Sequence, residues 1–217
     1  MRAKKILWIL LAVFVIGMIW LQDSGVSQEF FWTIYGVSVA ALFIVLVAIN
    51  QKELRTLQTE LEQLRSIRSS NPQEYIKRLQ QMLEGKKSRA VQALLMTELG
   101  AGYMASGDYE AAKRTLLAVP EKGLNVQVGQ MYYTYLGLTL FHLDKEEAAR
   151  KLMVLKAKEF SQAQNNPEIA PFYHMLQILC LLSEAKQQEA RAYLARHPEL
   201  EEREDCQADM RLIQRKL

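Results

Sequence analysis

The side chains that could support metal or nucleophilic chemistry are few and widely separated in this sequence. It contains three histidines and two cysteines. The closest His–Cys pair, His174 and Cys180, is six residues apart. Side chains share a helix face at separations of three and four, so this spacing is poor for two ligands on one helix. Cys180 also lies in an apolar run, which is typical of a small buried residue. We therefore expect structural or solvent-facing histidines and no metal site.

Familiar catalytic motifs are absent as well. The sequence has no glycine-rich phosphate loop and no H-E-x-x-H, G-x-S-x-G or C-x-x-C motif. Its 27 Lys and Arg residues nearly balance 24 Asp and Glu residues, for a formal net charge of +3, which does not favour nucleic-acid binding. Two cysteines are too few for a disulfide-rich secreted scaffold. We expect a protein that is not an enzyme, with no catalytic residue and no cofactor.

Two apolar stretches lie near the N-terminus, Ile6–Leu21 and Phe30–Ile49. A helix needs roughly 17–25 apolar residues to cross a bilayer. The sequence therefore predicts a transmembrane hairpin over residues 1–50, with spans at about 6–22 and 30–49. The first stretch is also compatible with a secretory signal, which leaves its cleavage open.

The charges that flank these stretches predict their orientation. Lys4 and Lys5 precede the first stretch, Asp23 and Glu29 lie between the two, and several basic residues beginning at Lys52 follow the second. The positive-inside rule then places both ends in the cytoplasm. We expect an integral protein of a plasma or inner membrane whose C-terminal domain is cytoplasmic.

A leucine stripe follows the second apolar stretch. Leu54, Leu57, Leu61 and Leu64 recur at spacings of three and four, which predicts a coiled-coil-like helical stalk over residues 51–70 and a homodimer through it. A single amphipathic helix that packs on its own domain or on lipid headgroups fits the stripe equally well. The segment Asn71-Pro72 predicts an N-cap and first turn for the next helix.

Residues 71–217 show helical periodicity and internal similarity. Three stretches share a pattern of apolar, small and turn residues, and they begin at Leu99-Gly100, Leu136-Gly137 and Ile178. Each continues through a turn to an alanine at equivalent positions, Ala112, Ala149 and Ala190. Self-similarity of this length is typical of stacked helix–turn–helix units.

This pattern resembles the tetratricopeptide repeat, whose signature includes Leu-Gly-x-x-Tyr followed by Ala-x-x-x-Phe. Gly100 and Gly137 then mark close approaches of neighbouring helices. Gly107-Asp108 supplies a turn and an N-cap, and Asp144 with Glu147 is expected to form a capping box. The predicted fold class is all-α: two transmembrane helices, a helical stalk and a TPR-like α-solenoid, closed by a capping helix over about Glu199–Lys216.

The resemblance implies a concave groove, lined by the first helix of each unit, that binds a peptide or helix of a protein partner. Phe141 is its expected main anchor. The predicted groove residues are Leu94, Thr97, Ala101, Met104, Met131, Thr134, Leu138, Phe141, Phe172, Met175 and Leu179. They are equally compatible with a core that neighbouring helices fill. The predicted function is a membrane-anchored scaffold or adaptor that assembles a protein partner. The alternative is a structural subunit of an oligomeric transport or secretion complex that acts through its membrane spans.

Overall fold

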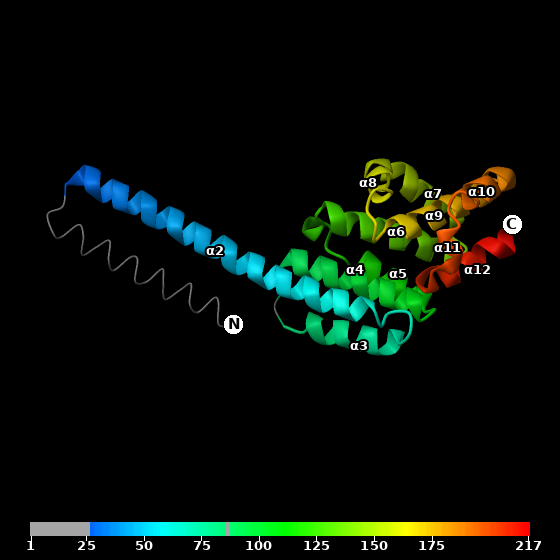
Figure 1. The fold of residues 1–217 in the computed structure, drawn as a ribbon, viewed down its shortest axis with the longest axis horizontal. Coiled ribbons are helices and arrows are strands. Elements are labelled where there is room, and N and C mark those ends of the chain that lie inside the picture. The colour runs from blue at the N-terminus through cyan, green and yellow to red at the C-terminus, as the bar shows by residue number, and fades with distance from the viewer. Residues whose placement is uncertain (1–26, 86) are drawn as a thin grey trace. The chain divides into compact units, whose positions relative to one another are not determined.

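The computed structural model describes residues 27–85 and 87–217 (Figure 1). The chain divides into two compact units, residues 1–62 and 63–217. Residues 63–217 are called the helical domain below. Every regular element among the described residues is a helix, so the all-α part of the predicted fold class is confirmed.

The first described helix, α2 (Gln28–Arg65), corrects the prediction for the N-terminal region. The expected span at 6–22 lies outside the described residues. The stretch at 30–49 is not a helix of its own, because α2 runs on through the charged residues that follow it. In the part of the chain that the structure describes, no helix combines the length and apolar character needed to cross a membrane. The predicted transmembrane helix at 30–49 is therefore wrong, whereas the one at 6–22 lies outside the residues that the structure describes.

The helical domain begins with the end of α2 and contains a succession of short helices. Their bounds are α3 (Pro72–Leu83), α4 (Arg89–Ala105), α5 (Tyr109–Leu117), α6 (Val126–His142), α7 (Glu146–Leu155), α8 (Ala157–Ala163), α9 (Ala170–Ser183), α10 (Gln187–Leu194), α11 (Glu199–Glu202) and α12 (Gln207–Lys216). Two 3-10 turns, η1 (Glu121–Gly123) and η2 (Glu204–Cys206), precede α6 and α12. Helices α4, α6 and α9 pack in sequence, and each contacts the shorter helix that follows the turn after it: α5, α7 and α10.

Local capping explains where several of these helices begin. The side chains of Asn71, Ser88, Asp108 and Asn125 each accept a hydrogen bond from a backbone N–H in the first turn. Such caps satisfy donors that the helix itself leaves unpaired. The predictions for Asn71-Pro72 and for Asp108 are confirmed.

The turns that end α4, α6 and α9 share one backbone conformation. The second residue after each helix has a positive φ: 80° at Gly107, 56° at Asp144 and 59° at Ala185. At each turn the next N–H donates to a carbonyl five residues back: Asp108 to Tyr103 at 3.0 Å, Lys145 to Leu140 at 2.9 Å, and Lys186 to Leu181 at 2.9 Å. This arrangement is the Schellman motif, so the three similar stretches also end alike.

The prediction of a capping box at Asp144 is wrong. Asp144 adopts the left-handed conformation that closes α6, and Lys145 takes the N-cap position of α7 without a side-chain hydrogen bond. An aspartate tolerates this conformation better than most side chains do, which explains why it serves as the end of one helix here.

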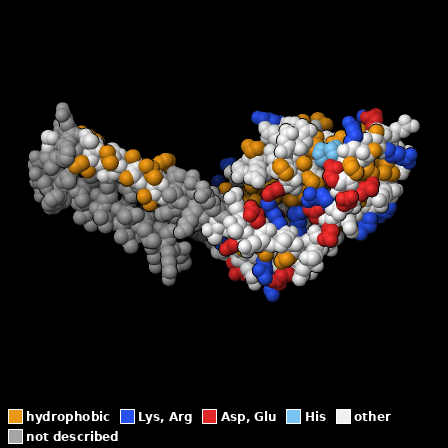
Figure 2. All heavy atoms as spheres, viewed as in Figure 1, with side chains coloured by type: hydrophobic (Ala, Val, Ile, Leu, Met, Phe, Trp, Pro, Cys, Tyr) orange, Lys and Arg blue, Asp and Glu red, His pale blue; other side chains and the backbone are white. Residues whose placement is uncertain are grey.

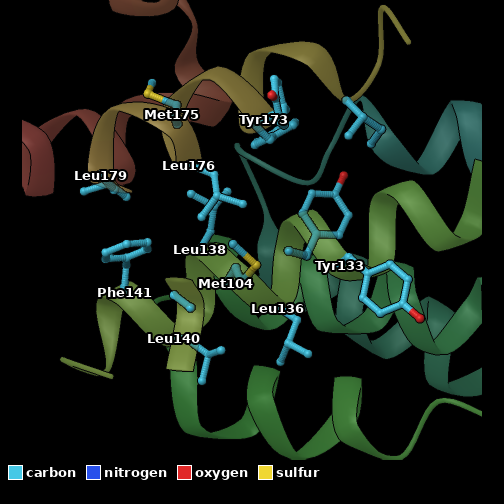
Figure 3. Packing of buried hydrophobic residues seen from close by; sticks show 14 of the residues in the cluster. Met104, Tyr133, Leu136, Leu138, Leu140, Phe141, Tyr173, Met175, Leu176 and Leu179 are labelled. Carbon is cyan, nitrogen blue, oxygen red and sulfur yellow. The ribbon is translucent and has the colours of Figure 1, made fainter. Parts of the chain in front are cut away.

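Glycines allow close helix packing at two predicted positions. A Cβ atom added to Gly100 would lie 2.6 Å from Leu116 of α5, and one added to Gly137 would lie 2.8 Å from Leu176 of α9. Real Cβ atoms do not approach other atoms this closely, so a side chain at either glycine would force the leucine to move. Figure 3 shows Leu176 beside Leu138 in this core.

The C-terminal segment is not the single helix predicted over Glu199–Lys216. It is divided into α11, η2 and α12, because Arg203 adopts an extended conformation, with φ −81° and ψ 121°. The predicted apolar stripe is nonetheless buried at Cys206, Met210 and Ile213, and both η2 and α12 contact α9.

Candidate protein-binding groove

The predicted groove residues come together within the helical domain, on α4, α6 and α9. Leu94 is partly buried, and all the others are buried: Thr97, Ala101, Met104, Met131, Thr134, Leu138, Phe141, Phe172, Met175 and Leu179. Figure 3 shows Met104, Leu138, Phe141, Met175 and Leu179 in this packing. The side chains thus contribute to the core in this structure, and their role in partner binding stays a prediction.

The end of α2 lies against the same three helices through Arg65. Its Nε donates to Glu98 of α4 at 2.9 Å, its Nη1 donates to Glu168 just before α9 at 3.0 Å, and its Nη2 approaches the sulfur of Met131 on α6 at 4.0 Å. A second bond from Nη2 reaches the same Glu98 oxygen. Arg65 therefore bridges parts of the domain that lie far apart in sequence.

Glu98 is a fully buried carboxylate, and its partners compensate for its loss of water. Besides Arg65, the hydroxyl of Tyr75 on α3 donates to it at 2.6 Å. Burial, together with the nearby Glu98 charge, raises the pKa of Tyr75 well above its usual range, so Tyr75 keeps its proton. Burial alone would lower the pKa of Arg65. The neighbouring Glu98 carboxylate has the opposite effect, through its charge and its hydrogen bond, and the pKa of Arg65 is raised overall. Arg65 therefore keeps its positive charge in this partly buried position.

Arg68 follows Arg65 by three residues and reaches the next part of the groove. Its Nη1 donates to the Tyr135 hydroxyl at 3.2 Å, and its Nη2 lies 3.5 Å from Asp205 of η2. The guanidinium also lies 5.4 Å from the ring centre of Phe172, within cation–π distance. Asp205 itself is bound by Arg203 through two hydrogen bonds, at 2.9 and 2.8 Å.

A hollow of about 220 Å³ remains open beside Arg68. Its lining comes from the end of α4, the start of α5, and from α6, α9, η2 and α12. Its lining mixes both charge signs with apolar and aromatic groups: Arg68, Ser69, Ala101, Met104, Ala105, Tyr109, Tyr135, Phe172, Glu204, Asp205, Gln207, Ala208, Asp209 and Arg211. Figure 2 likewise shows acidic and basic side chains intermixed on the visible face of the helical domain.

One polar pair beside the hollow is of a type found in catalytic sites. His142 Nε2 lies 2.7 Å from Asp209 Oδ1, and Tyr109 stacks on the imidazole at a ring distance of 3.9 Å. An Asp–His pair can orient a general base, but it then needs a nucleophile within hydrogen-bond reach. Within residues 27–85 and 87–217, no hydroxyl or thiol hydrogen-bonds to His142. The pair instead links α6 to α12.

The remaining histidines come together, which their distance in sequence did not indicate. The rings of His174 and His197 stack at 3.9 Å, and Tyr193 contacts His174. No group of three or more metal-ligating side chains occurs among the described residues.

The functional candidates that sequence reasoning missed are Arg65, Arg68 and Glu98. The available signal was a glutamate inside the apolar run of α4, between Leu95 and Leu99. A charge on the buried face of a helix requires a partner, but several basic residues lie closer to Glu98 in the sequence, so the pattern does not identify Arg65 or Arg68 as that partner. No family model, no curated protein and no solved structure matches the chain.

Proposed function

We propose that this protein is a non-catalytic scaffold of helical repeats, related in type to the tetratricopeptide repeat, and that its groove holds a segment of a protein partner. The single observation that supports this most is the hollow beside Arg68. Its lining offers donors, acceptors and aromatic surface together.

The chain's own helix end serves as a model for such binding. Leu64 is buried, and Arg65 at the end of α2 and Arg68 in the turn beyond it both bond to residues of the helical domain. We infer that a partner segment enters beside the end of α2 and places one side chain in the hollow.

The location of this scaffold stays a prediction from the sequence. The alternative function, a structural subunit of an oligomeric transport or secretion complex, depends on two membrane spans. It is not proposed further, because the described residues include no helix able to cross a membrane.

The test uses the full chain as bait and compares two variants in which an alanine is replaced by phenylalanine. Ala105 is exposed at the rim of the hollow, so Ala105→Phe fills it without disturbing buried side chains. Ala118→Phe, at an exposed position after α5, is the matched control. We expect proteins captured by the wild type to be lost with Ala105→Phe and retained with Ala118→Phe. Retention with both variants, at unchanged thermal stability, would exclude the hollow as the binding site.

A further inference from the structure

The connection between α10 and α11 rests on α9 through two histidines. His174 lies on α9, and His197 lies in the connection itself. Their rings stack at 3.9 Å with an interplanar angle of 23°. Two imidazoles at this distance are compatible when at least one is neutral, because two positive charges in contact repel each other.

Two tyrosines, one glutamate and one arginine surround this histidine pair. The Tyr193 hydroxyl of α10 lies 2.8 Å from His174 Nδ1, and Glu199 of α11 lies 3.1 Å from His197 Nδ1. Tyr173, on α9 itself, contacts the His174 ring edge-on, and Arg196 lies over the Tyr193 ring at 5.2 Å. Glu199 is therefore the one carboxylate among these neighbours that favours a protonated imidazole.

We propose that His174 and His197 form an acid-sensitive latch that holds the α10–α11 connection on α9. At neutral pH the stacked rings hold residues 195–198 against α9. The C-terminal segment Glu199–Leu217 begins directly after this attachment. When both rings gain a proton, the stack separates and the connection leaves α9. The segment that covers α9 then becomes mobile.

The direction of the His174 pKa shift agrees with a latch that opens when the pH falls. Burial and the neighbouring His197 lower the pKa of His174, and Glu199 opposes them only in part. A histidine with a lowered pKa in the folded state stabilises the fold above its unfolded value of about 6.5. That contribution is lost as the pH falls from about 6.5 through the lower folded-state value. The latch should therefore open on the acid side of neutrality.

Amide exchange of the full chain, followed by mass spectrometry at about pH 7.5 and about pH 5.5, measures this opening. After correction for intrinsic exchange, we expect exchange at residues 195–202 to rise about tenfold more than exchange in α4. His197→Phe keeps an aromatic ring on His174 but cannot be protonated, so this extra rise should disappear. A rise that persists unchanged in His197→Phe overturns the proposal.

A separate contact could also respond to acid, because His142 pairs with Asp209 of α12. Opening that begins at residues 207–216 and leaves 195–202 protected would place the sensitivity there, and would contradict the latch. Histidine ring titration by NMR in the wild type gives a readout that needs no variant. We expect His174 to titrate below about 6.5, and a midpoint at or above that value refutes the proposal.

Discussion

Removal of Arg65 tests the buried charge network at the end of α2 most severely. In Arg65→Met, Glu98 stays fully buried and keeps only the Tyr75 hydroxyl as a partner. Breaking a buried ion pair from one side costs about 3–5 kcal/mol, because the remaining charge has lost its compensation. The Arg65 side chain is 23% exposed, so we expect a loss near the lower end, about 3 kcal/mol.

Removal of the other partner should cost less. In Glu98→Leu, Arg65 retains Glu168 and some contact with water, and the main loss is the Tyr75 hydrogen bond, about 1–2 kcal/mol. The double variant leaves no unpaired buried carboxylate, so its stability should resemble that of Glu98→Leu. The cycle then gives a coupling energy equal to the cost of Arg65→Met alone, about 3 kcal/mol.

The assay is urea unfolding of the full chain, followed by circular dichroism. Arg78→Met is the matched control, because Arg78 pairs with Glu74 on the surface and is 56% exposed. Exposed pairs at this spacing contribute about 0.5 kcal/mol or less. If Arg65→Met costs no more than Arg78→Met, or if the double variant is simply additive, the assignment of Arg65–Glu98 as a buried pair is refuted.

Three further predictions concern turns, helix contacts and thiols. Ala185→Gly should stabilise the protein by up to about 1 kcal/mol, because it relieves a positive φ at an alanine, whereas Gly107→Ala should destabilise it by about 1 kcal/mol; equal effects in thermal melting would contradict the shared turn geometry. Gly137→Ala should cost about 1–3 kcal/mol because its Cβ meets a leucine of α9, while Gly129→Ala on the same helix has room and should gain about 0.5–1 kcal/mol; the opposite order in urea unfolding would show that the packing is misassigned. Burial raises the pKa of the Cys206 thiol to about 12, so it should react with thiol reagents only after unfolding, and rapid labelling of the folded chain would contradict its burial.

Local sequence signals predicted much of the helical domain. Asn71 and Asp108 could be identified as N-caps, and Gly100 and Gly137 as close contacts, because each depends on residue type at a fixed position in a short pattern. The turn at Asp144 shows the limit of this reasoning. The same residue suits the end of one helix and the start of the next, and only the backbone conformation decides between them.

The long-range contacts could not be predicted in this way. Arg65 bonds to a residue 33 positions away, and Arg68 contacts one 137 positions away. Nothing in a helical period identifies such partners. The same is true of the His174–His197 stack, whose members lie on different elements that only the folded domain brings together.

Composition alone also led to the wrong prediction near the N-terminus. The apolar residues at 30–49 predict a membrane span, but this stretch belongs to one helix from Gln28 to Arg65, and no helix among the described residues has the length and apolar character to cross a membrane. Leu64, the last residue of the leucine stripe, is buried, which agrees with the alternative of a helix that packs on its own domain. The homodimer through the stalk stays a prediction.

The most direct test of the groove is amide exchange of the full chain with and without a captured partner. Residues 63–70, the end of α2 and the turn that follows it, should be protected in both states, because their arginines are bound within the domain. Protection should increase at residues 101–109 and 204–211, which line the hollow. Free exchange at 63–70, or new protection confined to other surfaces, would contradict a groove that holds the chain's own helix end and a partner side by side.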